Sequence, residues 1–120
     1  MRKVFCLMLI LSALSGTAGG NPLLEPWDAP FGVAPFPSVE TAHFEPAFTA
    51  AIAAHEAEIA AIAGNPEAPT FANTIEALDT DGAELTRVRS VFGLLSGTMT
   101  NDDLQAVQRT MAPVLSRHRD

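Results

Sequence analysis

Apolar side chains recur at steps of three and four residues along most of the chain after position 40, which is the spacing of one face of an α-helix. Pro46 suits the first turn of a helix, where its missing N–H costs no hydrogen bond. Alanine fills most of the other positions and favours a helix. Gly64, Asn65 and Pro66 predict the end of this helix. The stripe of this first helix consists of Phe48, Ile52, His55, Ile59 and Ile62.

A second stripe predicts one long helix from about Phe71 to Leu95. Thr70 is the predicted N-cap, accepting a hydrogen bond from the amide of Asn73. Gly82 lies on the stripe and has two interpretations, a close helix crossing or a break in the helix at positions 79–82. The steps of three and four residues continue through Gly82 in register, which favours a single helix. The stripe contains Phe71, Ile75, Leu78, Gly82, Leu85, Phe92 and Leu95, widened by Val88 and Val91.

A turn at positions 96–99 and a third helix complete the pattern. Thr100 is the predicted cap, and Asp102 and Asp103 place negative charge in the first turn, where it suits the helix dipole. Pro113 should kink this helix or remove one of its hydrogen bonds. No strand pattern occurs, so the predicted fold class is all-α, with antiparallel helices packed as a bundle over residues 41–120. The third stripe contains Leu104, Val107, Met111, Val114 and Leu115.

Residues 19–40 form a proline-rich segment ahead of the helices. Proline fixes φ and has no N–H to donate, so the segment is neither a helix nor a central strand. It is too apolar for a free linker. We therefore expect an extended arm that lies across the folded surface and is anchored by Trp27 and the phenylalanines. Its apolar residues are Leu23, Leu24, Trp27, Phe31 and Phe36.

Residues 1–18 have the pattern of a secretory signal peptide: two basic residues, an apolar run and a tract of small residues. Gly16 and Ala18 favour cleavage after Ala18, and a cut one or two residues later fits equally well. A membrane span needs about 20 apolar residues and this run has about 11, so no stable membrane anchor is expected. The chain is therefore expected to be exported, to the periplasm or the medium.

Cysteine content and charge exclude several classes of function. Cys6 lies in the signal, so the mature chain has no thiol for a disulfide or a metal site. Loss of Arg2 and Lys3 leaves 5 basic residues against 14 acidic ones, a net charge of about −9 instead of −7. Such a chain is a poor partner for nucleic acid and for anionic lipid. A solvated acidic surface is favoured over a dedicated cation-binding role.

The segment His55-Glu56-Ala57-Glu58-Ile59 is the nearest approach to a catalytic motif. A His-Glu-x-x-His helix binds zinc because side chains four residues apart share one face. Ile59 replaces the second histidine, so the motif fails and His55 is predicted to be a hydrogen-bonded packing residue. His43 is expected to cap a helix entry, and His118 to lie near a helix C-terminus, where a cation is favoured. No two histidines have the spacing of metal ligands.

The other candidate binding and catalytic sites in the sequence are also incomplete. Asp79, Asp81 and Glu84 could bind calcium loosely, but they lack a loop of alternating oxygen ligands, and a solvated helix face is the preferred interpretation. Serine nucleophile motifs, phosphate-binding glycine loops and cysteine–histidine pairs do not occur. The residues therefore predict no catalytic, cofactor-binding or metal site in this chain.

Several phrases, taken in order, resemble a known family. Together they resemble the N-terminal region of the thimet oligopeptidase family of zinc metallopeptidases, and within it the peptidyl-dipeptidases (dipeptidyl carboxypeptidases) and oligopeptidase A. The stretch at 69–74 is the most specific part. The phrases are Asn21-Pro22-Leu23-Leu24, Pro35-Phe36, His43-Phe44-Glu45-Pro46-Ala47-Phe48, Asn65-Pro66-Glu67-Ala68-Pro69-Thr70-Phe71-Ala72-Asn73-Thr74-Ile75 and Thr100-Asn101-Asp102-Asp103-Leu104-Gln105.

The resemblance implies a part rather than a whole enzyme. Family members are several times longer, and their His-Glu-x-x-His zinc helix lies far toward the C-terminus, so no ligand or catalytic residue can be carried over. The resemblance implies helices that line part of a channel for short peptides. In the full-length enzyme, zinc would polarise the scissile carbonyl and activate water. We expect an inactive N-terminal fragment of an exported zinc metallopeptidase, whose partners are the remainder of the parent protein and its peptide substrates.

Two alternatives remain from the sequence. A freestanding exported helical module that binds other proteins without enzymatic activity would unfold cooperatively on heating. An acidic periplasmic metal buffer would be stabilised by calcium or zinc.

Overall fold

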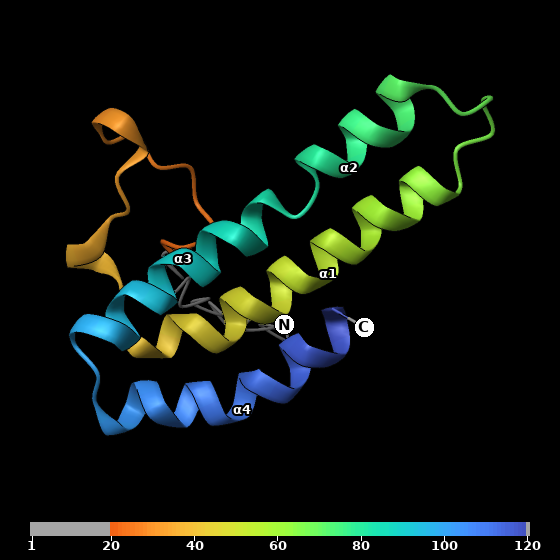
Figure 1. Ribbon diagram of the computed structural model, residues 1–120. Helices are drawn as coiled ribbons and strands as arrows, with labels where there is room; N and C mark the ends of the chain where they lie inside the picture. Colours follow the sequence, from red (N-terminus) through yellow and green to blue (C-terminus); the bar gives the residue numbers. More distant parts are fainter. Residues whose placement is uncertain (1–19, 120) are drawn as a thin grey trace, which may run out of the picture.

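The computed structural model describes residues 20–119, and the regular structure of that range is entirely helical (Figure 1). The all-α prediction is confirmed for these residues. The predicted signal peptide, residues 1–18 with Cys6, lies outside them. None of the described helices is both long and apolar enough to cross a membrane. The elements are η1 (Pro30–Gly32), η2 (Phe36–Ser38), η3 (Thr41–His43), α1 (Phe44–Ala63), η4 (Phe71–Glu76), α2 (Ala77–Thr80), α3 (Ala83–Thr98) and α4 (Asp102–Arg119).

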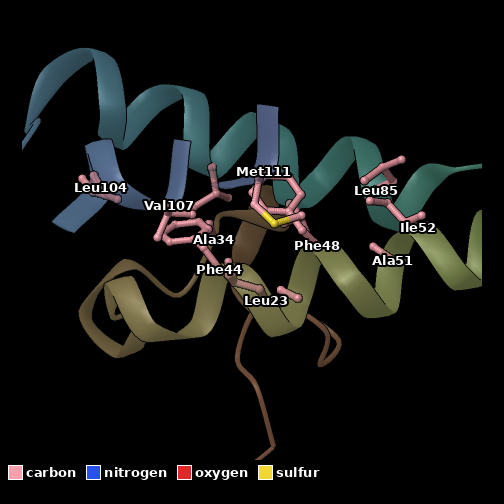
Figure 2. Close-up of a cluster of buried hydrophobic side chains, with 13 residues drawn as sticks. Leu23, Ala34, Phe44, Phe48, Ala51, Ile52, Leu85, Leu104, Val107 and Met111 are labelled. Carbon is pink, nitrogen blue, oxygen red and sulfur yellow. The ribbon is translucent and has the colours of Figure 1, made fainter. Parts of the chain in front are cut away.

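The core lies where α3 and α4 both pack against the first half of α1 (Figure 2). Phe44 and Phe48 are fully buried, and both meet the ring of Phe92 edge to face, with centroids 5.0 and 5.4 Å apart. Aromatic pairs prefer this geometry because a positive ring edge meets a negative face. The rest of the buried cluster comprises Leu23, Ala34, Ala47, Ala51, Ile52, Leu85, Val88, Val91, Leu104, Val107 and Met111.

The start of η4 and the end of α1 agree with the predictions from the sequence. Thr70 accepts a 3.1 Å hydrogen bond from the amide of Asn73, and the Asn73 side chain accepts one of 2.7 Å from the amide of Thr70. α1 ends at Ala63, and the amide of Gly64 still bonds back to Ala60 at 2.9 Å. The predicted cap at Thr70 and the predicted stop after Ala63 are both confirmed.

The single helix predicted over 71–95 is wrong. The segment starts as the π-helical turn η4, continues as α2 and breaks at Asp81 and Gly82 before α3 begins. Gly82 has φ +62°, a left-handed conformation that glycine adopts without the clash of a Cβ atom. α2 and α3 both pack against α1, but the stripe residues before the break, Phe71, Ile75 and Leu78, stay largely exposed. Gly82 therefore marks a break in the helix, whereas the continuous stripe had favoured a single helix.

The turn before the last helix also differs from the prediction. α3 remains helical through Thr98, so the expected turn at 96–99 is shorter than predicted. Asn101, not Thr100, caps α4, because its side-chain oxygen accepts a 2.8 Å hydrogen bond from the amide of Leu104. α4 continues past Pro113 to Arg119.

The extended arm predicted for residues 19–40 is not confirmed. The described part of this segment folds into turns and two short 3₁₀ helices, η1 and η2. Leu23 is buried in the core, and Trp27 lies half-buried with the guanidinium of Arg87 4.9 Å from its ring centre. Phe31, an expected anchor, is fully exposed at φ +64°. Leu23 therefore anchors the segment more firmly than the phenylalanine does.

The outer part of the α1–α2 hairpin contributes nothing to the core. α2 and the end of α1 project beyond α3 and α4 (Figure 1), and no residue between positions 53 and 81 is buried. Phe71, Ile75 and Leu78 keep 68%, 51% and 46% of their surface exposed. The sequence placed these residues on a stripe packed within the bundle. That expectation is wrong, since α4 lies along the other half of α1.

Candidate functional site

Four polar side chains form a continuous row where α1, the Asp81–Gly82 break and the end of α4 meet. Nδ1 of His55 lies 2.8 Å from Nε2 of His118, and the two rings meet edge to face. The other nitrogen of His55, Nε2, lies 3.2 Å from a carboxylate oxygen of Asp81. The other nitrogen of His118, Nδ1, lies 3.5 Å from a carboxylate oxygen of Glu56. The order of the row is therefore Asp81, His55, His118, Glu56.

Each member of the row is positioned by a different local feature. His55 continues the inner face of α1, one turn beyond buried Ile52, and Glu56 is the next residue in the same helix. Asp81 is presented by the break, where the backbone leaves the helical conformation at ψ 160°. His118 belongs to the last turn of α4. The predictions that His55 is a hydrogen-bonded packing residue and that His118 lies near a helix C-terminus are confirmed.

A second contact joins α1 to the same break. A carboxylate oxygen of Glu58 accepts a 2.7 Å hydrogen bond from the backbone amide of Gly82. A Cβ atom on Gly82 would lie 3.1 Å from the ring of His55. Backbone and imidazole therefore approach as closely as they do because position 82 has no side chain.

The remaining sequence candidates are separated from this row. His43 lies at the other end of α1, where its Nδ1 accepts a 3.0 Å hydrogen bond from the amide of Glu40. This bond caps η3, the turn that leads into α1, and the His43 side chain makes no cap bond to α1 itself. Ile59 is partly exposed on the outer half of α1. Asp81 faces His55. Among residues 20–119, no group of three or more His, Cys, Asp or Glu side chains is arranged to hold a metal ion.

Sequence reasoning missed the pairing of His55 with His118. The two residues are 63 positions apart, so no local spacing rule connects them. A weaker signal was available, because His118 continues the three-and-four repeat of Leu104, Val107 and Met111 just as His55 continues that of α1. Two histidines on the inward stripes of two packed helices are candidates for contact.

An apolar groove lies at the opposite end of the bundle, between the 36–41 segment and the α3–α4 turn. Its exposed lining includes Leu94 and Met99, and buried Phe44 and Leu104 form part of its base. Most of the lining side chains are apolar, and the polar ones are Thr41, Thr98 and Asn101, so the groove offers mainly contact area.

Comparison with known proteins relates the chain to peptidases. No protein-family model matches it. It is 38% identical over 96 residues to dipeptidyl carboxypeptidase of Salmonella typhimurium strain LT2, and 41% identical over 96 residues to dipeptidyl carboxypeptidase of Escherichia coli strain K12. Each alignment includes 80% of this chain and 14% of the relative, so the chain spans about one seventh of the relatives' length. The resemblance to the peptidyl-dipeptidase family is confirmed for this part of the sequence.

Proposed function

From this relationship to the peptidyl-dipeptidase family, we propose that the chain is the N-terminal helical part of an exported zinc metallopeptidase that hydrolyses short peptides. The support is an identity near 40% over four fifths of the chain, matched to one seventh of each relative. In this proposal the helices form part of the wall of the substrate channel. Peptide hydrolysis and its zinc ion belong to the remainder of the protein, and residues 20–119 supply packing surface.

The structural observation that carries the proposal is the apolar stripe on η4 and α2, which no other part of residues 20–119 covers. Phe71, Ile75 and Leu78 follow one another at steps of four and three, so they share one side of the segment. Ile59 of α1 adds a further exposed apolar side chain to this hairpin. Contiguous exposed apolar surface on a soluble protein commonly marks a contact with other polypeptide. The remainder of the peptidase is the partner we assign to it.

A chimera tests the proposal directly. The segment of the Escherichia coli dipeptidyl carboxypeptidase that aligns with this chain is replaced by the corresponding residues of this chain. We expect the chimera to fold and to release dipeptides from a blocked peptide in a chelator-sensitive reaction, within about tenfold of the parent rate (about 1.4 kcal/mol). Removal of the segment without replacement should abolish soluble enzyme.

Two matched variants of the chimera distinguish loss of the proposed docking contact from the general effect of placing a charge at an exposed apolar position. Ile75→Asp places a charge on the proposed contact and should reduce soluble active enzyme at least tenfold, because a buried unpaired charge is costly. Val33→Asp alters an apolar residue of similar exposure, 49% against 51%, away from the hairpin, and should have little effect. An inactive chimera, or equal activity of both variants, would count against the proposal.

Export rests on the sequence of residues 1–18. The proposal is that this stretch directs secretion and is removed near Ala18. Fused ahead of a reporter enzyme that works only outside the cytoplasm, residues 1–30 should give reporter activity and a new N-terminus within two residues of position 19. Replacing Leu9 and Ile10 by Asp should retain the reporter uncleaved inside the cell, and unchanged export would contradict the assignment.

A further inference from the structure

The hydrogen bond between His55 and His118 holds the end of α4 on α1. Nδ1 of His55 lies 2.8 Å from Nε2 of His118, and Met111, two turns earlier, is the last buried residue of α4. Within residues 20–119, the last part of α4 makes one other polar contact with a different element, that of the same His118 ring with Glu56 at 3.5 Å. The position of the end of α4 therefore depends on the pair of imidazole rings.

The helix is weakened just before this contact. Pro113 lies inside α4 and has no N–H, so the hydrogen bond to the carbonyl of Arg109, four residues earlier, is missing. Val114 and Leu115 pack against the core but are only partly buried. The part of α4 after Pro113 is thus attached to the rest of the helix by fewer hydrogen bonds, and its contact with α1 matters more.

The hydrogen bond between the two rings tolerates one added proton and not two. An N–H···N bond needs one nitrogen that carries a hydrogen and one that presents a lone pair. Two neutral rings meet this condition, and so does one protonated ring beside a neutral one. When both rings are protonated, both facing nitrogens carry hydrogens. Two N–H groups cannot face each other at 2.8 Å, and the two positive rings repel each other.

We propose that the pair His55–His118 is an acid-sensitive clasp, which keeps α4 on α1 while at least one ring is neutral. Uptake of the second proton separates the rings and releases the part of α4 after Pro113. Histidine side chains ordinarily change charge between about pH 5 and 8, so the clasp is closed above this range and opens toward its acidic end. The clasp belongs to this chain alone and does not depend on the proposed peptidase function.

The acidic groups around the clasp favour protonated rings. A carboxylate oxygen of Asp81 lies 3.2 Å from Nε2 of His55, and one of Glu56 lies 3.5 Å from Nδ1 of His118. Both carboxylates lie on the outer sides of the pair, so they attract each charged ring away from the other. Glu58, also on α1, is hydrogen-bonded to the backbone of the break. Opening therefore leaves each charged ring beside a carboxylate.

The basic groups near the clasp oppose the added charge. Arg117 and Arg119 flank His118 on α4, and Nε of Arg117 donates a 3.4 Å hydrogen bond to a carbonyl within α4. The nearest acids of α2 and α3, Asp79 and Glu84, form no ion pair with either ring among residues 20–119. The two arginines add to the repulsion that separates the rings once both are protonated.

Hydrogen exchange of the purified chain at pH 7.5 and pH 5, corrected for the intrinsic chemical rate, tests the clasp. On acidification, amides 114–119 should lose protection by about fivefold or more relative to amides 104–111. His55→Gln and His118→Gln should remove this difference between the two pH values, because neither variant has a pair of rings that can both be protonated. His43→Gln changes the only other histidine and should retain the difference. A wild-type pH difference in His118→Gln would refute the proposal.

A measurement without variants guards against a substitution that merely loosens the end of α4. In the chain labelled with ¹⁵N in its histidines, the coupling across the hydrogen bond should join Nδ1 of His55 to Nε2 of His118 at pH 7.5. At pH 5, both rings should show the ¹⁵N shifts of protonated imidazole and the coupling should be absent. If amides 114–119 stay fully protected while both rings are protonated, the pair does not control the end of α4 and the proposal is wrong.

Discussion

Glu58 accepts a 2.7 Å hydrogen bond from the backbone amide of Gly82, the residue at which the second helical segment breaks. One turn earlier on α1, His55 contacts Asp81, the other residue of the break. Side chains from successive turns of α1 therefore hold both residues of the interruption. The break is part of the packed structure, because the amide released from the helix ladder has a specific acceptor.

Removing the Glu58 carboxylate should loosen the break. Glu58→Ala is expected to lower the free energy of unfolding by about 1 kcal/mol, because the amide of Gly82 loses a charged acceptor while solvent replaces part of the bond. Urea unfolding followed by circular dichroism measures the change, and hydrogen exchange of the Gly82 amide should accelerate. Glu67→Ala, in the exposed loop after α1, is the control and should alter neither quantity. An unchanged exchange rate at Gly82 would contradict the role of Glu58.

Gly82 should tolerate no side chain. Gly82→Ala adds a Cβ in the left-handed region, 3.1 Å from the His55 ring, and should destabilise the fold by about 1–3 kcal/mol. Gly93→Ala is the matched control, because Gly93 lies inside α3 with no atom near the added carbon. That change should stabilise the protein by about 0.5–1 kcal/mol through helix propensity. Chemical denaturation of both variants should give opposite signs.

The aromatic core should dominate the stability of the bundle. Phe48→Ala removes a fully buried ring that meets Phe92 and should cost about 3–5 kcal/mol, enough to unfold a bundle of this size. Phe31→Ala removes a fully exposed ring and should change stability by less than about 0.5 kcal/mol. The helical signal at 222 nm distinguishes the two. A folded Phe48→Ala protein with an unchanged melting temperature would contradict the assigned core.

The start of α4 provides a test between two adjacent residues. Asn101→Ala should cost about 1 kcal/mol, because the amide of Leu104 loses its side-chain acceptor. Thr100→Ala should cost little, since Thr100 makes no side-chain hydrogen bond within the described structure. The melting temperatures of the two variants show whether Asn101 or Thr100, the cap predicted from the sequence, stabilises the start of α4.

The outer hairpin should be neutral to the folding of this chain. Phe71→Ser and Ile75→Ser alter exposed side chains and should each change the free energy of unfolding by less than about 0.5 kcal/mol. Both should slow aggregation at high protein concentration, measured by light scattering, because they reduce exposed apolar area. A loss of more than about 2 kcal/mol would mean that these residues already pack within the chain.

The sequence determined the features that depend on neighbouring residues. Periodicity identified α1 and α4 as helices, Gly64 and Pro66 placed the end of α1, and Thr70 was correctly predicted as a cap. The ordered phrases around 69–74 also indicated the peptidase family. All of these signals come from interactions within a few residues, or from direct comparison of sequence.

Only the tertiary structure decided which apolar faces are covered. The stripe of Phe71, Ile75 and Leu78 has the same period as buried stripes, and it stays exposed because α4 lies along the other half of α1. Periodicity also could not show that Gly82 breaks the helix, because the amide it frees is accepted by Glu58 from another element. The contact of His55 with His118 likewise required two helices to pack. Each of these outcomes depends on residues far apart in sequence, which local patterns do not encode.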